Sequence, residues 1–195
     1  ADLSTFAAVL NCDLTAMELK DLAFRLTKAG VPLAQIRVSG PFDVEKSEGK
    51  LRLEISGIDK QALNLAGAAS GMDFGTTTFN CTNDISLGNG GKTISLAGRF
   101  NLAQLQVKQN GQTSPTLDLH SDYSVTMDQA ASSAVLQKLD LTGTQDSRAL
   151  LQIGLSSPMT IGWGNASNAV GDAALNLVVT NLSDGYPWGI WIAYD

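Results

Sequence analysis

Hydrophobic and polar residues alternate along most of this chain, most regularly from Lys92 to Met127. Every second residue from Ile94 to Leu102 is apolar or glycine, the phase shifts by one before Leu105, and the alternation resumes at Leu117. A period of two residues is typical of half-buried β-strands. Between the two halves lies Asn110-Gly111, a pair that tolerates positive φ and therefore predicts a hairpin turn.

The same pattern, in weaker form, predicts about ten strands along the chain. A phase slip between Leu19 and Leu22 predicts a bulge, although the leucines up to Leu26 also fit a helical spacing. Gly40-Pro41 predicts the end of a strand. The predicted strands outside the central stretch are Leu3–Leu10, Leu14–Leu26, Ile36–Val38, Leu51–Ile55, Met72–Thr82, Val135–Leu141, Leu151–Leu155, Met159–Trp163 and Ala173–Val179.

One short helix is predicted, from Lys60 to Ala69, with Asp59 as its N-cap and residues 58–71 as the whole helix or crossover. The fold class is therefore all-β, with residues 1–195 as a single domain. We expect a long antiparallel meander that forms a curved, partly open sheet, a barrel or a sandwich. Its one apolar face is too large for the helix, so another layer, the sheet's own curl, a lipid or a partner must cover it.

Composition and charge reduce the number of function classes to consider. Hydrophobic residues make up 44% of the chain and charged residues 16%, against about 25% charged in typical soluble domains. The net charge is −6 and no basic cluster is present, which excludes nucleic acid as an expected partner and argues against charge-driven adhesion to an anionic membrane. The chain begins at Ala1 rather than Met, which indicates processing or a fragment of a longer protein.

The two cysteines, Cys12 and Cys81, leave two interpretations open. They form one disulfide in an oxidising compartment, or each is a small hydrophobic residue buried in its own strand. Neither lies in a CxxC motif or in a spacing typical of zinc sites.

Six short motifs between Gly98 and Leu182 make this region resemble the C-terminal part of AsmA-like proteins. They are, in order, Gly98-Arg-Phe-Asn-Leu102, Pro115-Thr-Leu-Asp-Leu119, Asp122-Tyr-Ser-Val125, Leu139-Asp-Leu-Thr-Gly143, Leu155-Ser-Ser-Pro-Met159 and Asn176-Leu-Val-Val-Thr-Asn-Leu182. The resemblance covers about half of the chain.

The resemblance implies a location and a role. AsmA-like proteins belong to the bacterial periplasm or cell envelope, are usually tethered to the inner membrane, and curl their sheets into a lipid-lined groove. They are linked to phospholipid transport and outer-membrane assembly. The resemblance thus implies a lipid or acyl chain as ligand and an envelope protein or a second copy as partner. A chain of 195 residues is too short for the long groove of full-length members.

We expect the ligand on the apolar face of the central strands and beside the tryptophans. The aromatic tail, residues 183–195, departs from the resemblance and holds two of the three tryptophans. It packs as a terminal strand, or it docks into a groove, a lipid interface or another chain's edge. The candidate ligand-binding residues are Phe100, Leu102, Leu117, Leu119, Tyr123, Val125, Trp163, Trp188 and Trp191.

A hydrolase that acts on acyl substrates is the alternative function. The only histidine, His120, shares one face of its strand with Asp118 and Asp122, which together offer a general base or a cation site. Alternating polar residues on a solvated sheet face are the ordinary interpretation of this trio. We expect no cofactor, apart from calcium under the hydrolase alternative. A third alternative is a structural domain whose open sheet edges pair with a partner.

Overall fold

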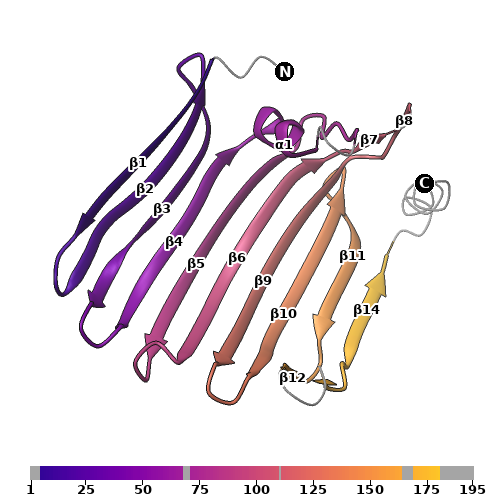
Figure 1. The fold of residues 1–195 in the computed structure, drawn as a ribbon. Coiled ribbons are helices and arrows are strands. Elements are labelled where there is room, and N and C mark those ends of the chain that lie inside the picture. The colour runs from indigo at the N-terminus through magenta and orange to yellow at the C-terminus, as the bar shows by residue number, and fades with distance from the viewer. Residues whose placement is uncertain (1–4, 68–70, 110, 164–168, 181–195) are drawn as a thin grey trace.

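The computed structural model describes residues 5–67, 71–109, 111–163 and 169–180, and strands dominate them (Figure 1). This confirms the predicted all-β class with one short helix. The elements are β1 (Phe6–Leu14), β2 (Glu18–Lys28), β3 (Val31–Asp43), β4 (Glu48–Ile58), α1 (Lys60–Gly67), β5 (Thr78–Gly88), β6 (Thr93–Leu105), β7 (Lys108–Gln109), β8 (Gln112–Thr113), β9 (Leu117–Asp128), β10 (Ser133–Gln145), β11 (Arg148–Leu155), β12 (Met159–Gly162), β13 (Ala169–Val170) and β14 (Leu175–Val179).

The large sheet is antiparallel and open. Its strand order is β1-β2-β3-β4-β5-β6-β9-β10-β11-β14, with β12 paired to β10 and β13 to β12. β1 and β14 lie at opposite sides (Figure 1), and β1 pairs only with β2 among the described residues. Of the three architectures expected from the sequence, the open sheet is the one observed, and the barrel and the sandwich were wrong for the described part of the chain.

The register places apolar residues of all ten strands on one face. Directly paired residues of neighbouring strands share a face of the sheet. We call the face that carries the following row the apolar face, and the opposite one the polar face. The row consists of Leu10, Phe24, Ile36, Ile55, Cys81, Phe100, Ser121, Leu141, Ile153 and Leu177.

Few hydrophobic side chains are fully enclosed, because the sheet is a single layer. Among the described residues, eight hydrophobic residues are buried. Most side chains of the apolar face, such as Phe100 and Ile153, are only half-buried. They pack sideways against neighbouring strands, and no other described element lies over them, since α1 sits at one end of the sheet (Figure 1).

Tight turns join the long strands and fix their register. Ala29 and Gly30 have φ of 49° and 80° between β2 and β3, and Asp146 and Ser147 have φ of 49° and 62° between β10 and β11. Two consecutive residues with positive φ match the right-handed twist of the flanking strands, which is why such turns are favoured in hairpins.

The bulge predicted between Leu19 and Leu22 is confirmed by a register shift between β2 and β3. The segment is a strand and not the rival helix. The prediction that Gly40-Pro41 ends a strand was wrong, because β3 continues to Asp43. Gly40 adopts φ of 141° with the Lys50 carbonyl directly where a Cβ would lie, so it absorbs a local irregularity without ending the strand.

The turn at Asn110-Gly111 connects two short strands, and not the two long strands of the central stretch as expected. β7 and β8 form a separate two-stranded ribbon on either side of it, with Gly111 at φ of 81° and residue 110 outside the described residues. The long strands β6 and β9 pair directly instead. The predicted phase shift before Leu105 is confirmed as a register shift between Leu102 and Leu105, where Gln104 has φ of 53°.

The predicted helix is present as α1. Asp59 caps it as expected, since its Oδ1 accepts hydrogen bonds from the backbone amides of Gln61 and Ala62 at 2.9 and 3.3 Å. The end predicted at Ala69 falls in residues 68–70, outside the described residues. α1 lies at the same end of the sheet as the β7–β8 ribbon (Figure 1).

Candidate ligand-binding face

The apolar face is continuous over the width of the sheet. Four further rows flank the one described above, and none of the five contains Asp, Glu, Lys or Arg. The central row spans nine strand spacings, about 40 Å, and the five rows together extend about 25 Å along the strands. Because the flanking rows are shorter than the central one, the face covers on the order of 1,000 Å². The flanking rows are Cys12, Leu22, Val38, Leu53, Asn83, Gly98, Tyr123 and Leu139; Leu51, Ile85, Leu96, Val125 and Leu136; Phe79, Leu102, Leu119, Gly143, Leu151 and Val179; and Leu87, Ile94, Met127, Ala134 and Ile161.

Most of the predicted ligand-binding residues meet on this face. β6 contributes Phe100 and Leu102, and β9 contributes Leu119, Tyr123 and Val125. The ring centroid of Phe100 lies 6.2 Å from that of Tyr123, a typical distance for interacting aromatic rings. The structure therefore brings these five side chains together as one surface.

Two of the four remaining predicted residues lie within the described part of the chain. Leu117, at the start of β9, is only 8% exposed and lies at the end of this surface, beside Leu119 and Leu151 at Gly143. Trp163 is 39% exposed and follows β12. Trp188 and Trp191, with the aromatic tail 183–195, lie outside the described residues.

The first half of the chain supplies as much of the apolar face as the second, which the candidate list missed. Phe24, Ile36 and Ile55 lie in the same row as Phe100. Their alternation with Arg25, Arg37 and Glu54 was the signal in the sequence. What could not be known from one strand at a time is that the registers of successive strands bring all these residues to one face.

A small polar cluster interrupts the apolar face at Tyr123. Its hydroxyl donates to Asn83 Oδ1 at 2.7 Å, and Asn83 Nδ2 donates to Cys81 Sγ at 3.0 Å. Gly98 lies between them on β6, where a Cβ would collide with the Asn83 amide. Partial burial and the neighbouring Cys81 raise the pKa of Tyr123 to about 12. The polar atoms of this cluster thus bond to one another, and the face stays uncharged.

Beside this cluster, Ser121 is fully buried, and its hydroxyl has no hydrogen-bond partner. It occupies the row position between Phe100 and Leu141. The small side chain leaves room for the larger ones on either side of it.

Both cysteines are free thiols, Cys12 exposed and Cys81 buried. They lie on β1 and β5, with three strands between them. Four strand spacings amount to about 19 Å, far beyond the Cα separation of a disulfide. Of the two interpretations of the sequence, burial as a small hydrophobic residue is confirmed for Cys81, and the disulfide was wrong.

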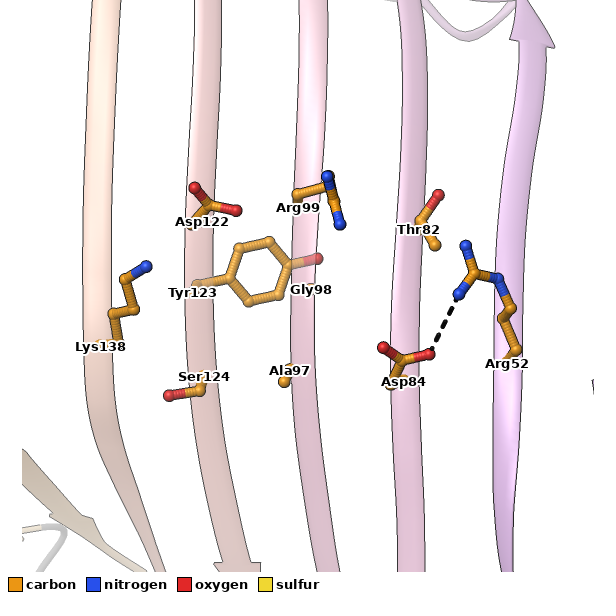
Figure 2. A pocket seen from close by; sticks show the side chains of 10 residues that line it. All are labelled: Arg52, Thr82, Asp84, Ala97, Gly98, Arg99, Asp122, Tyr123, Ser124 and Lys138. Carbon is orange, nitrogen blue, oxygen red and sulfur yellow. Dashed lines mark ion pairs between the residues drawn. The ribbon is translucent and has the colours of Figure 1, made fainter.

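The polar face carries charges that are largely paired. Arg52 bonds to Glu54 at 2.8 Å and lies 3.5 Å from Asp84, and Lys138 lies 3.3 Å from Asp140. Figure 2 shows some of these groups around a shallow depression of about 240 Å³, with the Arg52–Asp84 pair dashed. Exposed pairs of this kind contribute little to stability and serve mainly to keep a surface solvated.

His120, Asp118 and Asp122 lie on the polar face, as the alternation predicted. His120 Nδ1 donates to Asn101 Oδ1 at 2.6 Å, and its Nε2 lies 3.4 Å from Asp122 Oδ2. Asp118 instead accepts a hydrogen bond from the Gln104 backbone amide at 2.7 Å. The sheet separates the trio from the apolar face. In the described part of the chain, no hydrogen bond joins the imidazole to a hydroxyl that would act as a nucleophile.

Among residues 5–67, 71–109, 111–163 and 169–180, no three or more His, Cys, Asp and Glu side chains gather in a way that could hold a metal ion. The one described helix is too short to cross a bilayer.

Comparison of the chain with protein-family models, with curated proteins and with solved structures gives no match.

Proposed function

We propose that this protein is a non-enzymatic carrier or binding domain for lipids, whose apolar face holds acyl chains. The observation that carries the proposal is the continuous, uncharged face of half-buried side chains, over which no described element lies. Exposed apolar patches on soluble monomers rarely exceed a few hundred Å² unless they bind something. A face on the order of 1,000 Å² needs an apolar cover.

The chemistry of the face favours acyl chains over a folded protein partner. Protein interfaces typically carry about ten hydrogen bonds and are enriched in aromatic residues and Arg. Here the five rows are mainly aliphatic, and the polar cluster at Tyr123 satisfies its own hydrogen bonds. An acyl chain needs neither hydrogen-bond partners nor opposite charges on the surface that binds it.

The dimensions also suit an acyl chain that lies along the strands. One leaflet of a bilayer has a hydrocarbon depth of about 15 Å, and the rows extend about 25 Å along the strands. The polar face, with its paired charges, would stay in water. The resemblance to AsmA-like proteins supports the same ligand class and a place in the periplasm or cell envelope, with roles in phospholipid transport or outer-membrane assembly.

Native mass spectrometry of freshly purified protein, followed by organic extraction, tests the proposal. We expect adducts whose extracted masses are those of phospholipids or fatty acids. After extraction, the protein should take up a fluorescent acyl probe. A bare protein that takes up no probe would contradict the proposal.

Two neighbouring residues on opposite faces make a matched pair of variants for this test. Leu141→Gln places an amide in the central apolar row, and we expect at least a fivefold loss of probe affinity, about 1 kcal/mol. Thr142→Gln, one residue further along β10, lies on the polar face and should leave the affinity unchanged. His120→Ala should also leave it unchanged. Hydrolysis of an acyl ester that is lost in His120→Ala would instead favour the hydrolase alternative.

A further inference from the structure

The outer edge of β1 has no partner among the described residues. β1 pairs with β2 along its inner edge only, and its residues from Ala7 onward are exposed, with Leu10 at 67%. Edge strands are normally protected from further pairing by Lys, Pro or a bulge. Residues 6–13 contain no Lys and no Pro, and the register shift of β1 comes only after Asp13.

Two hydrogen bonds show which backbone groups of β1 face outward. The Ala29 amide donates to the Thr5 carbonyl at 2.8 Å, and the Thr27 hydroxyl donates to the Ala7 carbonyl. Odd-numbered residues therefore direct their backbone groups towards β2. In an antiparallel ladder, alternate residues direct these groups to opposite edges. The residues whose N–H and C=O point outward are thus Phe6, Ala8, Leu10 and Cys12.

We propose that β1 pairs with β1 of a second copy of this chain, antiparallel, about a twofold axis that passes beside Leu10. In this register, Leu10 faces Leu10 of the second copy, and Ala8 faces Cys12. Every outward-facing residue then meets another outward-facing residue, which an antiparallel hydrogen-bonded pair requires. The regular segment of residues 7–13 overlaps completely with its copy.

Charge and shape agree with this self-pairing. Asp13 is the only charged residue of the segment 6–13, and it faces Ala7 of the second copy, so no like charges meet. Small Ala8 lies opposite the larger Cys12. A twofold axis perpendicular to the sheet also keeps both apolar faces on the same side, so the two sheets form one continuous apolar face.

This pairing does not rest on the proposed lipid binding, because it involves the backbone of an edge strand. Association is therefore measured on protein from which lipid has been extracted, so that the pairing of β1 is tested separately from lipid binding. A failure to pair would leave acyl binding untouched, and a failure to bind acyl chains would leave the pairing untouched.

Sedimentation of the extracted chain at micromolar concentrations tests for the dimer. We expect a monomer–dimer equilibrium for the natural sequence. Leu10→Lys should raise the dissociation constant at least about tenfold, because two ammonium groups then meet at the axis.

Leu177→Lys is the matched control for that variant. It adds the same charge to the same row of the apolar face on β14, at the opposite edge of the sheet, where Leu177 is 62% exposed, and should leave the dimer intact. A natural chain that stays monomeric would overturn the proposal. So would an equal loss of association in both variants, because that result indicates head-to-tail pairing of β1 with β14.

Disulfide formation tests the register independently. In a Cys12→Ser background, Leu10→Cys places two thiols directly opposite each other at about 5.5 Å between Cα atoms, within disulfide reach. Mild oxidation should yield a covalent dimer. Ala8→Cys in the same background places the two thiols about 13 Å apart along the strands and should not cross-link. Equal cross-linking of both variants, or of neither, would overturn the register.

Discussion

At the scale of single residues, Gly98 is the position on which the polar cluster of the apolar face depends. Tyr123 on β9 reaches across this glycine to Asn83 on β5, and the hydrogen bond between them is 2.7 Å long. The ring lies over a position that has no side chain, an arrangement by which aromatic residues compensate for glycine in a strand.

Gly98→Ala should therefore lower the free energy of unfolding by about 1–3 kcal/mol, since the new methyl group displaces the Asn83 amide and breaks its bond to Tyr123. Urea unfolding followed by circular dichroism measures the loss. Gly88→Ala at the end of β5 is the control, because a Cβ there meets nothing within 4 Å, and its effect should stay within about 0.5 kcal/mol. Equal effects at the two positions would contradict the role given to Gly98.

The raised pKa of Tyr123 makes a prediction for alkaline pH. An unfolded tyrosine loses its proton near pH 10, whereas Tyr123 in the fold does so near pH 12. The stabilisation from this shift is therefore complete below about pH 10 and is lost as the pH rises towards about 12. Spectroscopic titration of tyrosinate should show one late step that is missing in Tyr123→Phe. A late step of the same size in both proteins would contradict it.

For single residues, the sequence predicted the sheet face on which a side chain lies better than the hydrogen-bond partner of that side chain. The face of Tyr123 followed from the alternation along β9. Its partner Asn83 could not be predicted, because an amide in an apolar position gives no sign of what satisfies it. The phase of Asn83 with Cys81 and Ile85 was the only available signal. It shows that an amide points to the apolar face, and only the register of β5, β6 and β9 shows why that is tolerated.

At the scale of elements, local sequence determined most turns, bulges and the helix. The slip between Leu19 and Leu22 revealed its bulge because the apolar phase changes there. The strand end predicted at Gly40-Pro41 was wrong, because a break in a strand and an irregularity within it look alike in sequence. Asn110-Gly111 specified a turn correctly, but not the short ribbon of β7 and β8 that the turn closes.

The cap of α1 makes a prediction at this scale. Asp59→Ala removes the acceptor for two backbone amides at the start of the helix and should lower the free energy of unfolding by about 1 kcal/mol. Lys60→Ala, one residue on, retains the cap and is the control in the same urea titration. An unchanged stability in Asp59→Ala would mean that the helix end does not unfold together with the sheet.

At the scale of the whole molecule, alternation predicts one apolar face but not what covers it. The same pattern suits a barrel, a sandwich or an open sheet. The choice depends on whether the first and last strands meet, and here β1 and β14 lie at opposite sides (Figure 1). The large apolar face follows from that openness. His120 and its two aspartates, placed correctly on the polar face, are remote from it.

A photoactivatable fatty acid shows most directly whether acyl chains lie on the apolar face. The protein is irradiated with the bound fatty acid, digested, and the labelled residues are identified by mass spectrometry. We expect labels on the central apolar row, at residues such as Ile55, Phe100 and Ile153, and none at neighbouring polar-face residues such as Glu54 and Asn101. Labels on both faces alike, or no label above that of an unfolded control, would contradict it.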